Sequence, residues 1–481
     1  MKRTSLTTAV IAGIAGVAGI SNMASAVYLN NDGLGQVLVY PYYTVNKGNS
    51  TIVTVVNTTQ QGKAIKVRFL EAYDSREVLD FNLFMSPLDV WTAQVVKVGS
   101  GAGVFSSDNS CTVPTLPKTA ATAYPFSTNA FAGTNSDGGP TTVARTLEGY
   151  AELIEMGTLQ GATLVATTHV AGIPPCAKIA ANPAADVTAP SGGLFGSGTI
   201  INVAAGTVEA YNADAIDQFW AAAPVGHYTG PGSILPNLAS GTSNTSYVFS
   251  PGPAGTTPTL ATSTFAQPRD AVSSLFMADA IYNEYWTTAT GALASEWVVT
   301  FPTKRFYVDS QITGLATAIL PFDVIFSSAN GGTSCSGIGL SYTGREEERA
   351  VITQGFSPPP PAAPANALCY EAQVVTFNQS GGASTILGSN LVDNITTGYD
   401  NGWATIQFWD GTALTANHYL GGGATGTANT FRGLPVTGFW VVQGTNGNLG
   451  GAGVLANYTA LYRHKSHRFC SLNNLGVAQC S

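Results

Sequence analysis

Alternation of apolar and polar residues is the feature of this sequence that most restricts its fold. Three apolar residues, Ile65, Val67 and Phe69, alternate with the charged residues Lys66 and Arg68. Because successive side chains of a strand point to opposite faces of a sheet, this pattern predicts a strand with one buried and one solvated face. The same criterion, with branched and aromatic residues, predicts strands at 91–95, 150–156, 164–170, 297–301, 305–308, 369–377 and 403–409.

Turn signals separate these runs, as at Asn31-Asp32-Gly33, Asn401-Gly402 and Asp410-Gly411. Helical periodicity is confined to two segments, 212–220 and 270–286, in which apolar residues recur about one turn apart. The sequence therefore predicts a mainly β protein. We expect antiparallel β-sandwich domains with long loops and a few short helices.

The length of 481 residues suggests more than one domain. Segments rich in Gly, Pro, Ser and Thr, at 106–142, 181–206 and 226–267, are predicted to be loops. We expect an N-terminal β-sandwich domain at 27–224, a loop and helix connector at 225–294, and a C-terminal β-sandwich domain at 295–481.

The first 26 residues have the pattern of a cleavable secretory signal. Lys2 and Arg3 precede an uncharged run at 9–20, and the small residues Ala24-Ser25-Ala26 fit a cleavage site before Val27. The run contains glycines and is shorter than the roughly 20 residues that a membrane span needs. We expect an exported protein of the periplasm, cell surface or extracellular space, with no transmembrane span in the mature chain.

All six cysteines follow the predicted signal, and an even number of cysteines in an exported protein predicts disulfides. Six cysteines allow about fifteen pairings, which the sequence alone does not distinguish. Pairing of nearest neighbours is the most economical. The predicted pairs are Cys111 with Cys176, Cys335 with Cys369, and Cys470 with Cys480.

Charged residues make up 10% of the chain, well below the usual quarter, and the net charge of −8 is scattered. This composition excludes nucleic acid as an expected partner. The densest group of charges is expected to form ion pairs on a solvated hairpin face. Its members are Glu71, Asp74, Arg76, Glu77 and Asp80.

Motifs for catalysis are not apparent. The chain has no Gly-x-Ser-x-Gly motif, no phosphate-binding loop and no spaced acidic calcium loop. His464 and His467 are close in sequence but lie among basic residues, which disfavours a bound cation. Glu152, Glu155 and Glu296 are candidate glycosidase carboxylates, although a strand position does not distinguish them from other acidic residues. We predict no catalytic, cofactor-binding or metal-binding residue and favour a role without catalysis.

Several strings resemble an uncharacterised group of exported bacterial β-rich proteins, over most of the mature length. They include residues 35–43, 67–71, 75–81, 296–309 and 456–458. The resemblance implies an exported β-protein and transfers no catalytic assignment.

Two functions fit these observations. The first is a structural or interaction protein of the cell surface, which binds itself or another surface protein; strand addition by residues 27–45 is one way to self-assemble. That segment is more simply a strand of its own sheet. The second is a glycan-binding protein or glycan hydrolase, in which Trp403 and Trp409 stack on sugar rings.

Overall fold

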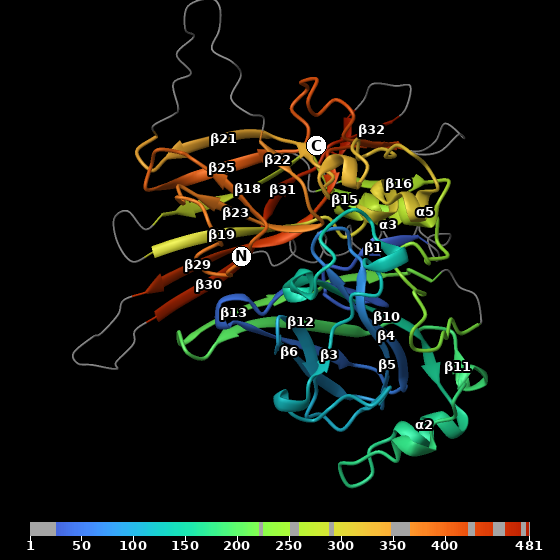
Figure 1. Cartoon of the computed structure of the whole chain (residues 1–481). Helices are drawn as coiled ribbons and strands as arrows, with labels where there is room; N and C mark the ends of the chain where they lie inside the picture. The colour runs from blue at the N-terminus through green and yellow to red at the C-terminus, as the bar shows by residue number, and fades with distance from the viewer. Residues whose placement is uncertain are drawn as a thin grey trace, which may run out of the picture.

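The computed structural model describes residues 26–220, 225–250, 259–287, 293–347, 366–421, 429–445, 457–472 and 478–480. The described chain is mainly β and contains several sheets and four short α-helices, which confirms the predicted fold class (Figure 1). The helices are α2 (Gly161–Thr167), α3 (Pro268–Phe276), α4 (Arg305–Val308) and α5 (Ser310–Thr313).

Two large sheets form the N-terminal half of the molecule. The ten-stranded sheet runs in the order β16 (Thr259–Thr264), β15 (Thr245–Ser250), β1 (Val27–Leu29), β14 (Asp214–Asp217), β2 (Val37–Thr44), β10 (Glu148–Leu159), β4 (Lys63–Glu71), β5 (Glu77–Met85) and β8 (Cys111–Val113), with β11 (Val187–Thr188) beside β10. The six-stranded sheet runs in the order β13 (Thr207–Asn212), β12 (Leu194–Asn202), β3 (Ser50–Asn57), β6 (Val90–Val98), β7 (Gly101–Phe105) and β9 (Tyr124–Pro125).

The predicted alternation places one face of β4 in the core between these two sheets. Ile65, Val67 and Phe69 belong to the same buried cluster as Val53 of β3 and Trp91 of β6. Burial of these large apolar side chains is the main favourable term that holds the two sheets together.

Two further sheets form the C-terminal half. The five-stranded sheet has the order β24 (Val392–Ile395), β23 (Ala372–Phe377), β19 (Leu293–Thr300), β29 (Thr437–Thr445) and β30 (Asn457–Arg463). The outer sheet has the order β21 (Gly339–Gly344), β25 (Asn401–Gln407), β18 (Ala280–Trp286) and β31 (Lys465–His467). In Figure 1, β19, β29 and β30 lie between the outer sheet and the N-terminal strands.

The central strand of the five-stranded sheet, β19, is buried on both faces from Ser295 to Thr300. Trp297 of β19 belongs to the cluster that includes Tyr285 and Ala404 of the outer sheet. Its neighbour Val298 belongs instead to the cluster that includes Phe69 of β4. Alternate residues of one strand therefore enter two different cores, which explains the apolar run Trp297-Val298-Val299 within it.

Short pairings complete the fold. They join β17 (Met277–Ala278) to β28 (Leu434–Pro435) and β20 (Ser336–Gly337) to β22 (Ala367–Leu368), and they connect β26 (Tyr419–Gly421), β27 (Asn429–Arg432), β32 (Cys470–Leu472) and β33 (Ala478–Cys480) in one small sheet.

The first strands lie inside their own sheet. β2 is hydrogen-bonded to β14 on one edge and β10 on the other, and β1 lies between β14 and β15. Neither strand has a free edge for a neighbouring molecule. Self-assembly by β-strand addition stays a prediction.

The predicted connector, residues 225–294, contains several strands as well as α3. β15 and β16 extend the ten-stranded sheet, whereas β18 belongs to the outer sheet. The division into two domains at residues 224 and 294 stays a prediction.

The predicted short elements are partly wrong. Residues 212–220, predicted as a helix, end β13 and form β14, which pairs with β2. The segment 270–286 forms α3 only to Phe276 and then continues as β17 and β18. Two predicted strands, 164–170 and 305–308, lie mostly in α2 and α4. A short apolar run does not show whether a segment is a helix or a strand, because the neighbouring strand that decides between the two is distant in sequence.

Disulfides join Cys111 to Cys176 and Cys335 to Cys369, the first two predicted pairs. The backbones of Cys470 and Cys480 lie opposite each other in the β32–β33 pair, but their side chains are outside the description and this third disulfide stays a prediction. The predicted signal, apart from Ala26, also lies outside the described residues. None of the four described α-helices has the length and hydrophobicity that crossing a lipid bilayer requires.

Candidate functional site

The charged face of β4 is buried, so the prediction of a solvated face is wrong. Lys66 and Arg68 are 0% and 2% exposed. Each is paired: Lys66 Nζ lies 2.9 Å from Asp80 Oδ2, and Arg68 contacts Glu77 at 2.6 Å and Glu152 at 2.5 Å. These contacts form a buried layer of ion pairs rather than the predicted ion pairs on a solvated hairpin face.

Distant segments cover this layer. The carbonyl of Gly230 accepts a hydrogen bond from Lys66 Nζ at 2.7 Å, and the amide of Gly232 donates to Asp80. Arg76, also predicted to be solvated, contacts Asp74 and Asp309, the latter at 2.9 Å from the C-terminal half. Alternation within β4 carries no information about these covering segments, which is the physical reason for the error.

The candidate catalytic carboxylates are buried and hold loops in place. Glu155 contacts Lys63 Nζ at 2.7 Å and accepts hydrogen bonds from the amides of Ser191 and Gly192. Glu296 accepts from the amides of Ile386 and Leu387 at 2.6 and 3.0 Å. Burial raises the pKa of both carboxyl groups, against the hydrogen bonds that lower it. The third candidate, the carboxylate of Glu152, is paired with Arg68.

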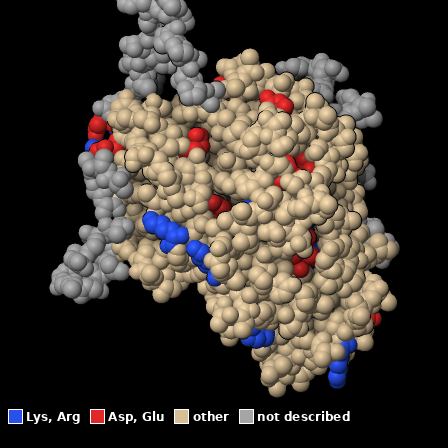
Figure 2. Space-filling view, viewed as in Figure 1, with Lys and Arg blue, Asp and Glu red and all other residues tan. Residues whose placement is uncertain are grey.

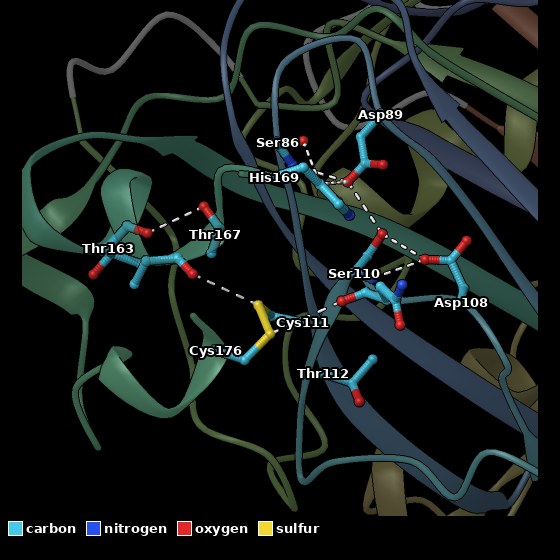
Figure 3. The surroundings of a disulfide bond; sticks show 12 residues. Ser86, Asp89, Asp108, Ser110, Cys111, Thr112, Thr163, Thr167, His169 and Cys176 are labelled. Atoms are coloured by element: carbon cyan, nitrogen blue, oxygen red, sulfur yellow. Dashed lines mark hydrogen bonds and ion pairs between the residues drawn. A yellow bond between two sulfur atoms is a disulfide. The ribbon is translucent and has the colours of Figure 1, made fainter. Parts of the chain in front are cut away.

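One serine, histidine and aspartate cluster lies beside the Cys111–Cys176 disulfide (Figure 3). Ser86 Oγ lies 3.0 Å from His169 Nδ1, and Asp89 Oδ2 lies 3.9 Å from the same nitrogen. A catalytic triad needs the serine and the carboxylate on different ring nitrogens. Asp89 instead accepts from the Ser86 amide and from Ser110 Oγ, so the cluster fixes a turn.

The two neighbouring histidines do not converge. The ring of His464 lies 2.7 Å from the carbonyl oxygen of Val298, whereas His467 lies 2.7 Å from Asp279. Within the described part of the chain no three His, Cys, Asp or Glu side chains are grouped to hold a metal ion.

The outer sheet carries large aromatic side chains on an exposed face. Its strands alternate, so that Ala404 and Ile406 of β25 are buried while Trp403 is 49% exposed. In β18 the buried Ile281 is likewise followed by Tyr282, which is 38% exposed. An exposed tryptophan is costly to leave in water, and two large rings on one open sheet face are typical of a binding surface.

The strand register brings these rings together. Trp403 lies opposite Glu284 of β18, and Tyr282 lies opposite Thr405 of β25. The two aromatic residues are therefore diagonal neighbours, about 7–8 Å apart at their Cα atoms. We define the aromatic face as the outward residues of these strands. They are Ser341, Thr343, Trp403, Thr405, Gln407, Tyr282, Glu284 and Lys465.

The aromatic face combines rings with hydroxyl, amide and single charged groups. Lys465 of β31 lies opposite Tyr282, and Thr343 of β21 lies opposite Trp403. Charge is sparse on the face of the molecule shown in Figure 2, where Lys, Arg, Asp and Glu occupy only small separate patches. Such a surface suits a neutral, hydroxyl-rich ligand better than a highly charged one.

Sequence reasoning found part of this surface. Trp403 was predicted as a stacking residue, and it is exposed. Trp409, predicted with it, has one side of its ring covered by the Arg432 guanidinium at 4.0 Å. Tyr282 was missed because it lies in the segment predicted as a helix; the alternation of Ile281, Asn283 and Tyr285 with exposed residues was the available signal.

No protein-family model matches the chain, and comparisons with curated proteins and with solved structures gave no match either. The functional argument therefore depends on the geometry of the chain itself.

Proposed function

We propose that this protein is an exported, non-catalytic binding protein that holds a glycan on the aromatic face of the outer sheet. The observation that carries the proposal is the exposure of Trp403 beside Tyr282 on an open sheet surface. The apolar face of a sugar ring stacks on an aromatic ring, and the hydroxyl and amide groups around it bond sugar hydroxyls.

The surroundings of Glu284, the exposed carboxylate of the aromatic face, favour binding over hydrolysis. Glycosidases need two carboxyl groups about 5 to 9 Å apart across the scissile bond. The register places Trp403, not a second carboxylate, opposite Glu284. The carboxylates nominated from sequence are buried beneath other segments and are not available to a ligand.

Export is part of the proposal. The disulfides Cys111–Cys176 and Cys335–Cys369 support an oxidising compartment such as the periplasm or the cell exterior. We propose that residues 1–26 are the secretory signal and that the protein acts at the cell surface, where glycans are abundant.

The test is a glycan array probed with the purified protein, followed by calorimetric titration of any glycan that binds. Trp403→Ala is expected to weaken binding about tenfold or more, because it removes the stacking ring. Tyr282→Ala is expected to weaken it less, since its ring is smaller and less exposed.

Tyr458→Ala is the matched control, because Tyr458 is 64% exposed but lies on β30, outside the aromatic face. Its affinity for the glycan should equal that of the wild type. A protein that binds no glycan on the array, or a Trp403→Ala variant that binds normally, would contradict the proposal.

A further inference from the structure

A small pocket lies on the other side of β31 from the aromatic face. It forms where β1, α3, β18 and the β28–β29 turn meet the chain around β31. Its apolar wall consists of Leu29, Phe276, Ile281 and Val436, and its polar wall of Thr437, Arg463, His464, Ser466 and Arg468.

One of the two arginines in this pocket already has an anionic partner. The guanidinium of Arg463 contacts Asp214 Oδ1, and the other carboxylate oxygen accepts a hydrogen bond from Thr437 Oγ1 at 2.5 Å. Asp214 is 2% exposed, whereas the Arg463 side chain is 59% exposed, so the carboxylate is buried and its cationic partner lies at the surface. The Asp214 carboxylate is therefore not free to balance a second cation.

The other arginine, Arg468, has no hydrogen bond or ion pair from its guanidinium to any described residue. Burial, and to a smaller extent the neighbouring Arg463 charge, lowers the pKa of Arg468 to about 10. Arg468 is still protonated at neutral pH and its side chain is only partly exposed, so the pocket contains a partly buried cation that no described residue pairs.

The rest of the pocket does not supply that anion. Burial lowers the pKa of His464 to about 4, so its ring is neutral at pH 7 and adds no charge to the pocket. Outside the described residues the sequence has a single acidic side chain, Glu348. The two arginines and Asp214 leave one positive charge uncompensated.

We propose that this pocket binds a small monocarboxylic acid, whose carboxylate pairs with Arg468 and whose apolar part lies against Phe276 and Ile281. A guanidinium fork matches a carboxylate with two parallel hydrogen bonds. A single negative charge balances the pocket, whereas a doubly charged phosphate or sulfate would exceed it, and neither has an apolar part for the opposite wall. Ser466 adds a hydroxyl donor at the rim. This proposal is independent of the glycan site, which faces away from the pocket.

The experiment is calorimetric titration of the full mature chain with hexanoate and benzoate, with hexanol and benzamide as uncharged analogues and with inorganic phosphate and sulfate as anions without an apolar part. The wild type should bind the two carboxylates and neither analogue. Arg468→Met should reduce the carboxylate affinity at least tenfold, and Arg468→Lys should reduce it less, because the lysine keeps the charge but loses the fork.

Lys465→Met is the matched control: it removes one positive charge three residues earlier in the chain, on β31 and on the aromatic face, and it should leave carboxylate binding unchanged. The ligand-free Arg468→Met variant should melt no lower than the wild type, since it loses an unpaired cation. Absence of carboxylate binding, equal binding of phosphate or sulfate, equal losses in Lys465→Met and Arg468→Met, or an Arg468→Met chain that does not fold would each overturn the proposal.

Discussion

The covered face of β4, β5 and β10 and the aromatic face of the outer sheet differ in an instructive way. The first consists largely of charged side chains and is buried; the second carries a tryptophan and a tyrosine and is exposed. Both belong to strands that alternate in the same manner. Alternation therefore shows which residues share a face, but the segments that cover the sheet decide which face meets water.

The difference also separates stability from binding. Buried charges in the first region are tied to partners from distant segments, such as Asp309 beside Arg76, so their removal should affect folding. The rings of the aromatic face are exposed, so their removal should affect a ligand more than the fold. The following predictions test this separation.

The largest effect is expected from Arg145→Met. Arg145 is buried, and its guanidinium contacts Glu71 at 2.7 Å and Asp137 at 2.5 Å. Methionine keeps much of the packing against the Phe131 ring but leaves the buried Glu71 without its cation, and Asp137 keeps only Arg76 at 3.4 Å. We expect a loss of about 3 kcal/mol in the free energy of unfolding, measured by urea denaturation.

Arg345→Met is the control for this experiment. Arg345 also pairs with a carboxylate, that of Glu346, but both side chains are about 70% exposed. Exposed pairs contribute little, so the unfolding midpoint should not move measurably. Equal stabilities of the two variants would show that the buried ion pairs of Arg145 do not hold the fold.

A smaller effect is expected from Trp297→Phe, compared with Trp403→Phe. Trp297 is fully buried, its ring contacts Phe377, and its Nε1 donates a hydrogen bond to the carbonyl of Glu284 at 3.0 Å. The substitution removes that bond and leaves a cavity, which should cost about 2 kcal/mol. Trp403→Phe should leave the unfolding free energy unchanged while it weakens glycan binding. Comparable destabilisation by both variants would mean that Trp403 is a structural residue.

The sequence predicted much of the fold and little of its interior charge. The alternation at Ile65, Val67 and Phe69 predicted both the strand and its apolar face, and nearest-neighbour pairing predicted Cys111 with Cys176. The burial of Lys66 was not predictable, because the Gly230 carbonyl that covers it is 164 residues away in sequence. Local patterns report local geometry, whereas burial of a second face depends on long-range packing.

The candidate sites show the same limit. Trp403 could be proposed from sequence because it is an aromatic residue in a predicted strand. Such a residue lies either in the core or on the exposed face, and the structure distinguishes the two. Tyr282 was hidden by an apparent helical period that continued from α3, which ends at Phe276. Arg468 had no sequence signal, since its unpaired charge becomes visible only when the position of Asp214 is known.

The smallest effect concerns Glu209 of β13, a buried carboxylate without a cationic partner among the described residues. Burial is the main cause that raises its pKa to about 7, and its side chain contacts Gln443 at 3.5 Å. Because this value lies above the ordinary 4.5, folding favours the neutral acid. The stabilising contribution is complete below pH 4.5 and is lost as the pH rises to about 7.

Glu209→Gln keeps a neutral group of the same shape, so it should remove this part of the pH dependence. We expect the difference between the free energies of unfolding at pH 5 and pH 8 to be smaller in the variant by on the order of 1 kcal/mol, measured by urea denaturation at both values. Glu284→Gln, on the exposed aromatic face, should leave the difference as it is in the wild type. If Glu209→Gln behaves like Glu284→Gln, burial of the Glu209 carboxylate does not change the free energy of unfolding between pH 5 and pH 8. The buried charged face and the exposed aromatic face would then differ in packing and not in the energetics of charge burial.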